Sequence, residues 1–377
     1  MIIFASETFY IMKKIVLFLL MSALVVSPAF AREKEKAPKN EKVKNVILLI
    51  GDGMGLAHVA TWMISQDYGP TAFDRAQFVG VSKTYSANNR VTDSAASATT
   101  MATGHKTNNG MLGMLPDGTE PENIGELARA KGIPMGLIAT SYVLDATPGA
   151  FYAHAANRGH FKDIMEDLIA LKPAVLVGGG RRYFTDEKYT GGENMIDKAV
   201  QAGFTYCETP EQFYETEATP ILGLFSEGSY PMVIERDSDF LADALNHTLD
   251  IFGKSKKGFF IMAEGSHIDH AAHANNAEQM VFEMEEFDKA VNAAFDYADT
   301  HKGTLVIVTA DHETGGVTLL SGDRDYTKGE SGINVTYSTN GHSGSPVLIY
   351  SYGASAWKFG RVMENTAIFD QIKELLF

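Results

Sequence analysis

Short apolar runs alternate with segments of helical spacing along most of the chain. The apolar runs have the length of strands and predict strands at residues 46–50, 78–82, 135–140, 174–177, 232–234, 259–263, 305–309 and 347–350. The segments between them predict helices at 56–65, 94–103, 123–131, 161–171, 238–250, 277–300 and 363–375. Near-continuous apolar strands separated by helices are typical of a mostly parallel sheet covered on both faces. We therefore predict an α/β fold, a three-layer α/β/α sandwich around a central, mostly parallel sheet.

The N-terminal segment has the pattern of a signal peptide. Within residues 1–31, a basic pair precedes an apolar run at 15–26, and Ala-Phe-Ala at 29–31 has the form of a cleavage site. The apolar run is shorter than a membrane-spanning helix needs, so a retained anchor is the less favoured alternative. Residues 32–44 are charged and predict a flexible linker before a folded domain at 45–377. We expect a periplasmic or secreted protein with no membrane partner after cleavage.

Residues 181–232 show the least regular pattern of apolar and polar positions, and they predict an insertion or a cap over the sheet edge.

Composition and charge limit the classes of partner. The only cysteine, Cys207, excludes an internal disulfide. The formal net charge of −15 argues against a nucleic-acid complex and repels anionic substrates at long range. A phosphate site on this chain must therefore be made positive locally, by metal ions or by an arginine.

Acidic and histidine residues gather where predicted strands end. Ligands of open α/β sheets bind beyond the carboxyl ends of the strands. Carboxylates collected there repel each other, and divalent cations relieve that repulsion. Zinc takes histidine nitrogen and aspartate oxygen, whereas magnesium prefers oxygen. Any one such residue is more commonly a cap or a structural side chain, but the joint pattern favours a metal cluster. The candidates that follow the strands, or precede the last one, are Asp52, Glu264, Asp269, His273, Asp311, His312 and His342.

A candidate nucleophile opens a predicted helix. Asp93 and Ser94 precede a run of small residues that ends at Gly104. A serine at a helix N-terminus lies in the positive end of the helix dipole, which favours bound phosphate and a developing alkoxide. Because no Ser-His-Asp triad is visible, a metal ion is the expected activator. The alternative is that Ser94 or Asp93 is only a helix cap.

A second segment supplies oxygen donors and an arginine. Asp145 and Thr147 follow the predicted strand at 135–140 and offer hard oxygen ligands. Arg158 is suited to hold a phosphate through two parallel hydrogen bonds. A solvated surface arginine is the alternative for that position.

The residues named above lie in sequence blocks that resemble those of the alkaline phosphatase family. Six blocks appear in the family's order and run from the start of the predicted domain nearly to its end. The resemblance implies a usually dimeric α/β/α enzyme with two zinc ions and one magnesium ion. The blocks are DGMG at 52–55, VTDSAASATTMATG at 91–104, DATPGAFYAHAANR at 145–158, EGSHIDHAAHANN at 264–276, TADHETGG at 309–316 and GHSG at 341–344.

The resemblance also assigns roles to individual residues. One zinc would be held by Asp269, His273 and His342. The second would be held by Asp52, Asp311 and His312, with Ser94 on it. The magnesium would be held by Asp52, Glu264 and Thr147, with Asp145 close by. Arg158 would bind two phosphate oxygens and Asp93 would orient it, while His270 occupies a variable position that tunes the third metal site.

The resulting expectation is a hydrolase that dephosphorylates a broad range of phosphate monoesters. Ser94 would form a phosphoserine intermediate, and the products would be an alcohol and inorganic phosphate. The alternatives are a phosphodiesterase or a sulfatase of the same superfamily, and a non-catalytic binder of metal or phosphate. A sulfatase needs a cysteine-derived nucleophile, and Cys207 lies in the unpatterned region. A diesterase would lack an arginine that contacts two free phosphate oxygens.

Overall fold

The structure, a computed structural model, describes residues 41–236, 238–320 and 335–377. The predicted signal peptide and residues 32–40 of the predicted linker lie outside these described residues. Within the described ranges, no helix has both the length and the apolar character needed to cross a membrane. The first strand, β1, begins at Asn45.

A ten-stranded sheet forms the centre of the described chain, in the order β14-β2-β13-β8-β1-β7-β3-β4-β6-β5. Every neighbouring pair is parallel except those of β13, which runs antiparallel to β2 and β8. The prediction of a mostly parallel sheet is therefore confirmed. In sheet order, the strands are Val362–Glu364, Phe78–Lys83, Val347–Gly353, Thr304–Thr309, Asn45–Gly51, Phe259–Gly265, Met135–Tyr142, Val175–Gly179, Ile221–Leu224 and Thr205–Cys207.

Residues 46–50 of the central strand β1 are all apolar, and the packing of the strand explains why. Val46 and Leu48 pack into one core cluster, and Ile47 and Leu49 pack into the other. Successive side chains of a strand point to opposite faces. Both faces of β1 are therefore buried, and no polar position interrupts the run.

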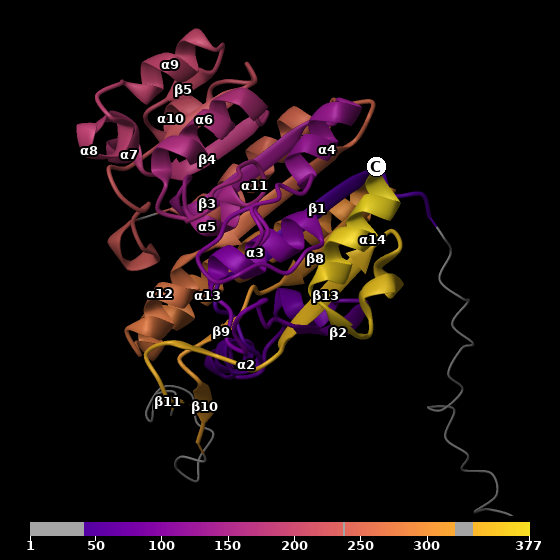
Figure 1. Cartoon of the computed structure of the whole chain (residues 1–377). Helices are drawn as coiled ribbons and strands as arrows, with labels where there is room; N and C mark the ends of the chain where they lie inside the picture. Colours follow the sequence, from indigo (N-terminus) through magenta and orange to yellow (C-terminus); the bar gives the residue numbers. More distant parts are fainter. Residues whose placement is uncertain (1–40, 237, 321–334) are drawn as a thin grey trace, which may run out of the picture. The chain divides into compact units, whose positions relative to one another are not determined.

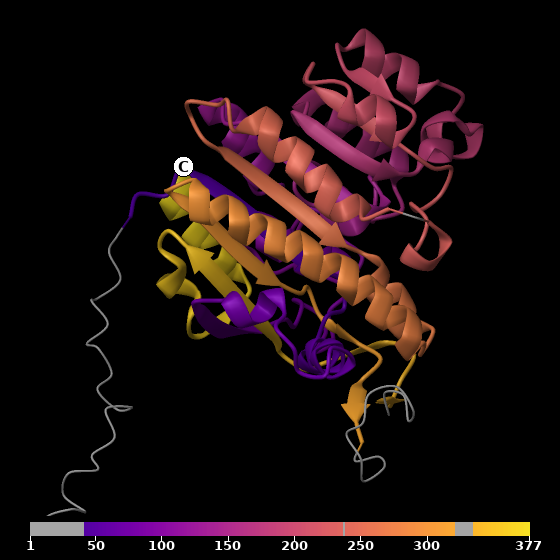
Figure 2. The ribbon, with the colours of Figure 1, turned by 180° about the vertical axis from the view of Figure 1, so that it is seen from behind.

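Helices cover both faces, so the predicted three layers are confirmed (Figures 1 and 2). One face carries α3 (Ser94–Thr103), α4 (Ile124–Lys131), α6 (Phe161–Leu171) and α14 (Thr366–Leu376). The other carries α2 (Leu56–Ser65), α11 (Phe240–Phe252) and the long α13 (Ala277–Thr300), which is prominent in Figure 2. The shorter elements on the same chain are α5 (Ala146–Gly149), α12 (His267–His273), η2 (Ala72–Arg75) and η4 (Ala356–Phe359).

Residues 181–232, which the sequence left unpatterned, contain four short helices and two strands. The strands β6 and β5 continue the sheet in parallel beyond β4. This region therefore contributes to the central sheet itself. Its helices are α7 (Arg181–Thr185), α8 (Glu187–Thr190), α9 (Met195–Gln201) and α10 (Pro210–Tyr214).

The strand predicted at 232–234 is wrong, because the chain forms a 3-10 turn, η3 (Val233–Glu235), at that point. The backbone N–H of Val233 donates to Glu283 Oε1 over 3.0 Å, and the N–H of Met232 donates to Glu235 Oε2 over 3.2 Å. Side-chain carboxylates thus take the backbone donors that a sheet ladder would have used. Ile234 faces solvent with 59% of its surface exposed, so burial gives no reason for a strand.

The topology brings the functional segments to one edge of the sheet. β8, β1 and β7 are neighbours, so the segments after their carboxyl ends meet. A small antiparallel pair, β9 (Glu313–Thr314) and β12 (His342–Ser343), places His342 opposite Thr314. The antiparallel pair β10 (Val317–Leu319) and β11 (Val335–Tyr337) belongs to the same segment of the chain, between β8 and β13.

Candidate active site

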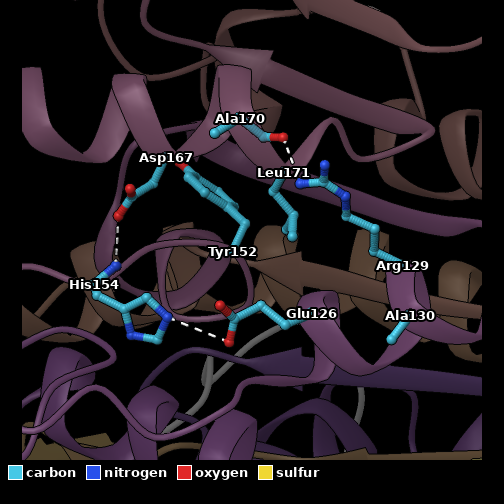
Figure 3. Close-up of a pocket in the computed structure, with 8 residues that line it drawn as sticks. All are labelled: Glu126, Arg129, Ala130, Tyr152, His154, Asp167, Ala170 and Leu171. Carbon is cyan, nitrogen blue, oxygen red and sulfur yellow. Dashed lines mark hydrogen bonds and ion pairs between the residues drawn. The ribbon is translucent and has the colours of Figure 1, made fainter.

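A cleft of about 410 Å³ lies between α4 and α6 (Figure 3). Its charged groups hold the protein's own backbone. Glu126 accepts from the N-terminus of its own helix, Asp167 accepts from the N–H of His154 over 2.8 Å, and Arg129 donates to the carbonyl of Ala170 over 2.7 Å. Because these contacts already use the polar groups, the cleft is not the candidate site.

The first candidate metal group consists of Asp52, Asp311 and His312, all buried at the ends of β1 and β8. Their ligand atoms lie within 4.8 Å of one another. His312 Nε2 is 3.1 Å from Asp311 Oδ2 and 3.5 Å from Asp52 Oδ1. Both of these carboxylate oxygens are buried without a hydrogen-bond partner, whereas Asp311 Oδ1 accepts from the N–H of Gly53. Unpaired buried oxygens beside a ring nitrogen fit a cation.

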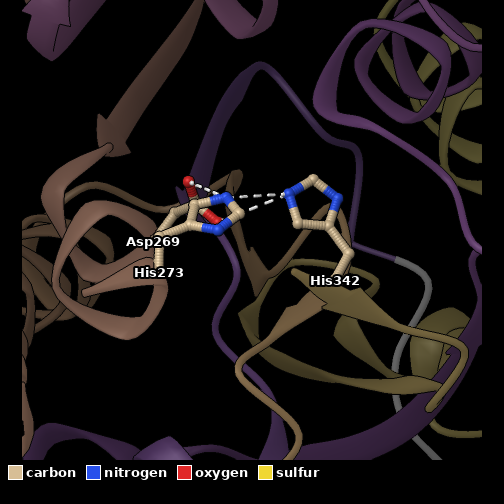
Figure 4. Close-up of side chains that lie close together, drawn as sticks. All are labelled: Asp269, His273 and His342. Carbon is tan, nitrogen blue, oxygen red and sulfur yellow. Dashed lines mark hydrogen bonds and ion pairs between the residues drawn. The ribbon is translucent and has the colours of Figure 1, made fainter. Parts of the chain in front are cut away.

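The second candidate metal group consists of Asp269 and His273 on α12 and His342 on β12 (Figure 4). The Nδ1 atoms of the two histidines face the carbonyls of Asn340 and Thr92. A carbonyl only accepts, so each Nδ1 carries a hydrogen and Nε2 is the ring atom left to bind a metal ion. The two Nε2 atoms lie 3.2 Å apart, and His273 Nε2 lies 3.3 Å from Asp269 Oδ2. This convergence of donors also fits a metal ion.

Thr314 connects the two metal groups, and sequence reasoning missed it. Its hydroxyl donates to Asp269 Oδ1 over 2.5 Å and lies 3.1 Å from His312 Nδ1. The single hydroxyl hydrogen goes to Asp269, so His312 Nδ1 donates and its Nε2 lone pair faces the first group. The available signal was the alternation of strand side chains, which points Thr314 to the same side as His312.

Ser94 is the first residue of α3 and lies beside the first metal group. Its Oγ is 3.2 Å from His312 Nε2, and only 5% of its surface is exposed. Asp93 caps the helix by accepting from the N–H of Ala96 over 2.9 Å. The sequence thus sets the hydroxyl at a capped helix N-terminus, where the backbone dipole favours negative charge.

Arg158 and Asp93 do not pair in the way that the resemblance implies. The guanidinium of Arg158 donates to Asp145 Oδ1 over 2.7 Å. The second oxygen of Asp93 accepts from the N–H of Gly110 over 2.8 Å, so backbone donors occupy both of its oxygens. In this structure Asp145 is therefore the residue that orients Arg158.

A third set of donors consists of oxygens alone. Thr147 Oγ1 and Glu264 Oε2 are buried without a hydrogen-bond partner. Burial raises the pKa of Glu264 to about 8, and the neighbouring carboxylate of Asp145 adds to the shift. Burial, followed by the charges of other carboxylates, also raises the pKa of Asp52. Buried oxygen donors close to other carboxylates fit a hard cation such as magnesium.

His270, the predicted tuning residue, lies against His267. Their Nδ1 atoms are 2.9 Å apart, and His267 Nε2 faces the carbonyl of Tyr230 over 2.7 Å. The structure therefore places His270 on α12 next to Asp269, in contact with a buried histidine.

Residues 43–332 match the family model described as alkaline phosphatase. Alkaline phosphatase 3 of Bacillus subtilis is 39% identical over 310 residues, which cover 78% of this chain and 66% of that relative. The streptomycin-6-phosphate phosphatase of Streptomyces griseus is 30% identical over 94% of each chain. The solved alkaline phosphatase of the Antarctic bacterium TAB5 superposes with a TM-score of 0.83 at 34% identity, over 90% of this chain and 99% of that one. A variant of the TAB5 enzyme was solved with magnesium bound in its M3 site.

Proposed function

The chain belongs to the alkaline phosphatase family, and we propose that it hydrolyses phosphate monoesters through a phosphoserine on Ser94. One observation carries the proposal. The hydroxyl of Ser94 lies 3.2 Å from His312 Nε2, beside buried carboxylate oxygens that lack any hydrogen-bond donor. The negative charge of these carboxylates would repel an anionic substrate from Ser94. A bound cation is therefore needed to neutralise that charge.

We propose zinc for the two groups of mixed nitrogen and oxygen donors and magnesium for the oxygen-only set. The donor types support this division, because zinc accepts histidine and aspartate while magnesium prefers oxygen. When bound, the cations would lower the pKa of the serine hydroxyl and neutralise charge on phosphate oxygens. The magnesium found in the M3 site of a TAB5 variant supports the third assignment.

The chain's own residues account for the transfer of the phosphoryl group. Ser94 Oγ would form a bond to phosphorus while the bond from phosphorus to the alcohol oxygen breaks, and the alcohol leaves with a proton. Water would then form a bond to phosphorus, release Ser94 and return a proton to its Oγ. Arg158, held by Asp145, would bind two free phosphate oxygens through both steps.

A monoester is the favoured substrate over the alternatives of the same superfamily. A monoester has three non-bridging oxygens, so two can bind Arg158 while the third faces the metal groups, whereas a diester has only two in all. Cys207, the only candidate for a cysteine-derived sulfatase nucleophile, is buried in the edge strand β5, with β3, β4 and β6 between it and β7. Several relatives bear the name alkaline phosphatase, and the Streptomyces relative is named for a single phosphate ester.

We also propose that residues 1–31 are removed as a signal peptide and that a periplasmic or secreted homodimer results. The sequence pattern of a basic pair, an apolar run and a small-residue cleavage site supports the first part. The N-terminal mass of protein from the culture medium or periplasm, together with light scattering, tests both parts.

The decisive experiment compares p-nitrophenyl phosphate with its bis-ester for the wild type and Ser94→Ala, alongside elemental analysis. We expect the wild type to contain zinc and to prefer the monoester. Ser94→Ala should keep its metal and lose most turnover and all phosphoserine labelling. Near-normal turnover in Ser94→Ala would exclude the assigned nucleophile, and a preference for the bis-ester would favour a diesterase.

A further inference from the structure

We propose that Ser97 and Asn365 form a buried hydrogen-bond relay that positions Asp311, so that the C-terminal segment helps to set the geometry of the first metal group. The inference rests on the proposed function only in taking Asp311 as a metal ligand. Both relay residues act through Asp311 and are positioning residues.

The relay consists of two hydrogen bonds with a fixed direction. Ser97 Oγ donates to the backbone carbonyl of Asp311 over 2.7 Å, and Asn365 Nδ2 donates to Ser97 Oγ over 3.3 Å. The one hydroxyl hydrogen of Ser97 is used by the carbonyl, so its oxygen must accept, and the amide nitrogen of Asn365 must face it. Ser97 and Asn365 are each 1% exposed and Asp311 is fully buried, so solvent does not replace these bonds.

The first bond ties the nucleophile to the ligand segment. Ser97 lies three residues after Ser94, one turn along α3. Asp311 lies beyond the end of β8, where the sheet ladder no longer fixes the backbone. The N–H groups of Gly53 and His312 hold its side-chain oxygen Oδ1, and Ser97 holds its carbonyl. The same bond therefore fixes the distance between the helix that presents Ser94 and the carboxylate of Asp311.

The second bond explains why a polar amide, Asn365, occupies a buried position. Asn365 lies between β14 and α14, and its backbone N–H donates to the carbonyl of Lys83. Its Oδ1 is buried without a hydrogen-bond partner, which carries a free-energy cost. An apolar side chain would avoid that cost. The polar contact that Asn365 makes with its side chain is the one to Ser97, which supports a role in holding Ser97 rather than in holding α14.

The experiment compares Ser97→Ala, Asn365→Leu and the double variant with Thr100→Val as the matched control. Thr100 is buried on the same helix, but its hydroxyl donates to the carbonyl of Ala96 within α3. The readouts are zinc retention against a chelator, the melting temperature after metal removal, and kcat/KM for p-nitrophenyl phosphate.

We expect Ser97→Ala to weaken zinc retention by about 10–100-fold, the usual effect of losing a group that orients a ligand. Asn365→Leu should weaken it less, without lowering the melting temperature of the metal-free protein. The double variant should match Ser97→Ala alone, since Asn365 acts through Ser97. Thr100→Val should retain zinc as the wild type does.

The proposal is overturned if Asn365→Leu retains zinc normally, or if the effects of the two substitutions simply add. It is also overturned if Thr100→Val loses zinc as readily as Ser97→Ala, because the effect would then reflect general packing of α3. Should Ser97→Ala not fold, Asn365→Leu decides alone. A wild type that neither binds zinc nor turns over substrate would refute the proposed function, which is a different result.

Discussion

Two clusters of buried acids in this protein are neutralised in different ways. Glu286 on α13 forms an ion pair with Arg236, and the two side chains are only 3% and 6% exposed. In the same cluster, Glu283 accepts from the backbone of η3. At the strand ends, Asp52 and Asp311 instead carry buried oxygens with no hydrogen-bond donor. In the cluster that only holds a loop, a residue of the chain itself, Arg236, neutralises the buried Glu286.

The difference indicates what each cluster is for. A buried acid that lacks a partner costs several kcal/mol, so it persists only where another group provides the charge. The arginine of the second cluster, Arg158, is bound to Asp145 at the edge of the site and is 34% exposed at its side chain. The deeper acids of the site are thus the candidate metal ligands, and Glu286, the paired acid of α13, serves as an internal control.

The largest expected effect follows from removing one unmatched acid. Asp311→Asn should lose zinc and lower kcat/KM by about a thousandfold or more, since a metal contributes several kcal/mol of charge stabilisation. The variant should also lose the stabilisation that bound metal gives the wild type, because it no longer holds the ion. Elemental analysis, p-nitrophenyl phosphate assays and thermal melts measure these effects. Wild-type zinc content in the variant would contradict the conclusion that the two clusters are neutralised in different ways.

The next effect concerns the paired cluster. Arg236→Met leaves Glu286 buried and unpaired, so the free energy of unfolding should fall by about 3–5 kcal/mol. Turnover per folded molecule should not change. Urea denaturation measures the loss, and adding Glu286→Leu to the same chain should recover most of it. An unchanged stability would mean that Arg236 does not neutralise this cluster.

A pH effect separates Glu283 from its paired neighbour. Burial, with a smaller contribution from Glu286, raises the pKa of Glu283 from 4.5 to about 7. An acid whose pKa is raised in the folded state stabilises the fold most when the pH is below its pKa in the unfolded state. This contribution is lost as the pH rises through the folded-state pKa. Wild type should therefore lose up to about 3 kcal/mol more than Glu283→Gln between about pH 5 and pH 8. Parallel stability curves for the two proteins would contradict this.

The smallest effect is at the edge of the site. Arg158→Ala removes a charged hydrogen-bond donor worth about 1.5–3 kcal/mol, so the inhibition constant for inorganic phosphate should rise about 10–100-fold. Arg129→Ala, at the cleft of α4, is the control and should leave phosphate inhibition as it is. If both variants bind phosphate equally well, Arg158 needs another role.

The sequence predicted best those elements that are buried on both sides. The central residues of β1, β7 and β8 are apolar because helices cover both faces of these strands, so their apolar runs stand out. β5 and β6 were missed because they are three and four residues long and lie at the sheet edge. Short runs of that kind carry too little periodicity to separate them from loops.

The candidate site was predicted as a set of residues, and its internal contacts were not. The motifs pointed to the ligands of both metal groups, which the fold brings together. The choice of Asp145 over Asp93 as the partner of Arg158 depends on the loop that brings Gly110 to Asp93. The contact of Asn365 with Ser97 joins residues 268 apart, and no local pattern encodes such a pairing.

The candidate metal ligands are spread along the chain, which limits when the site can form during synthesis. His342 Nε2 lies 3.7 Å from Asp269 Oδ1, and the backbone N–H of Gly53 bonds to Asp311 across 258 positions. A nascent polypeptide that ends before residue 342 lacks part of the second group, however well its earlier strands have paired. Assembly of the centre is therefore a late event in biosynthesis, and premature termination products should sequester little metal.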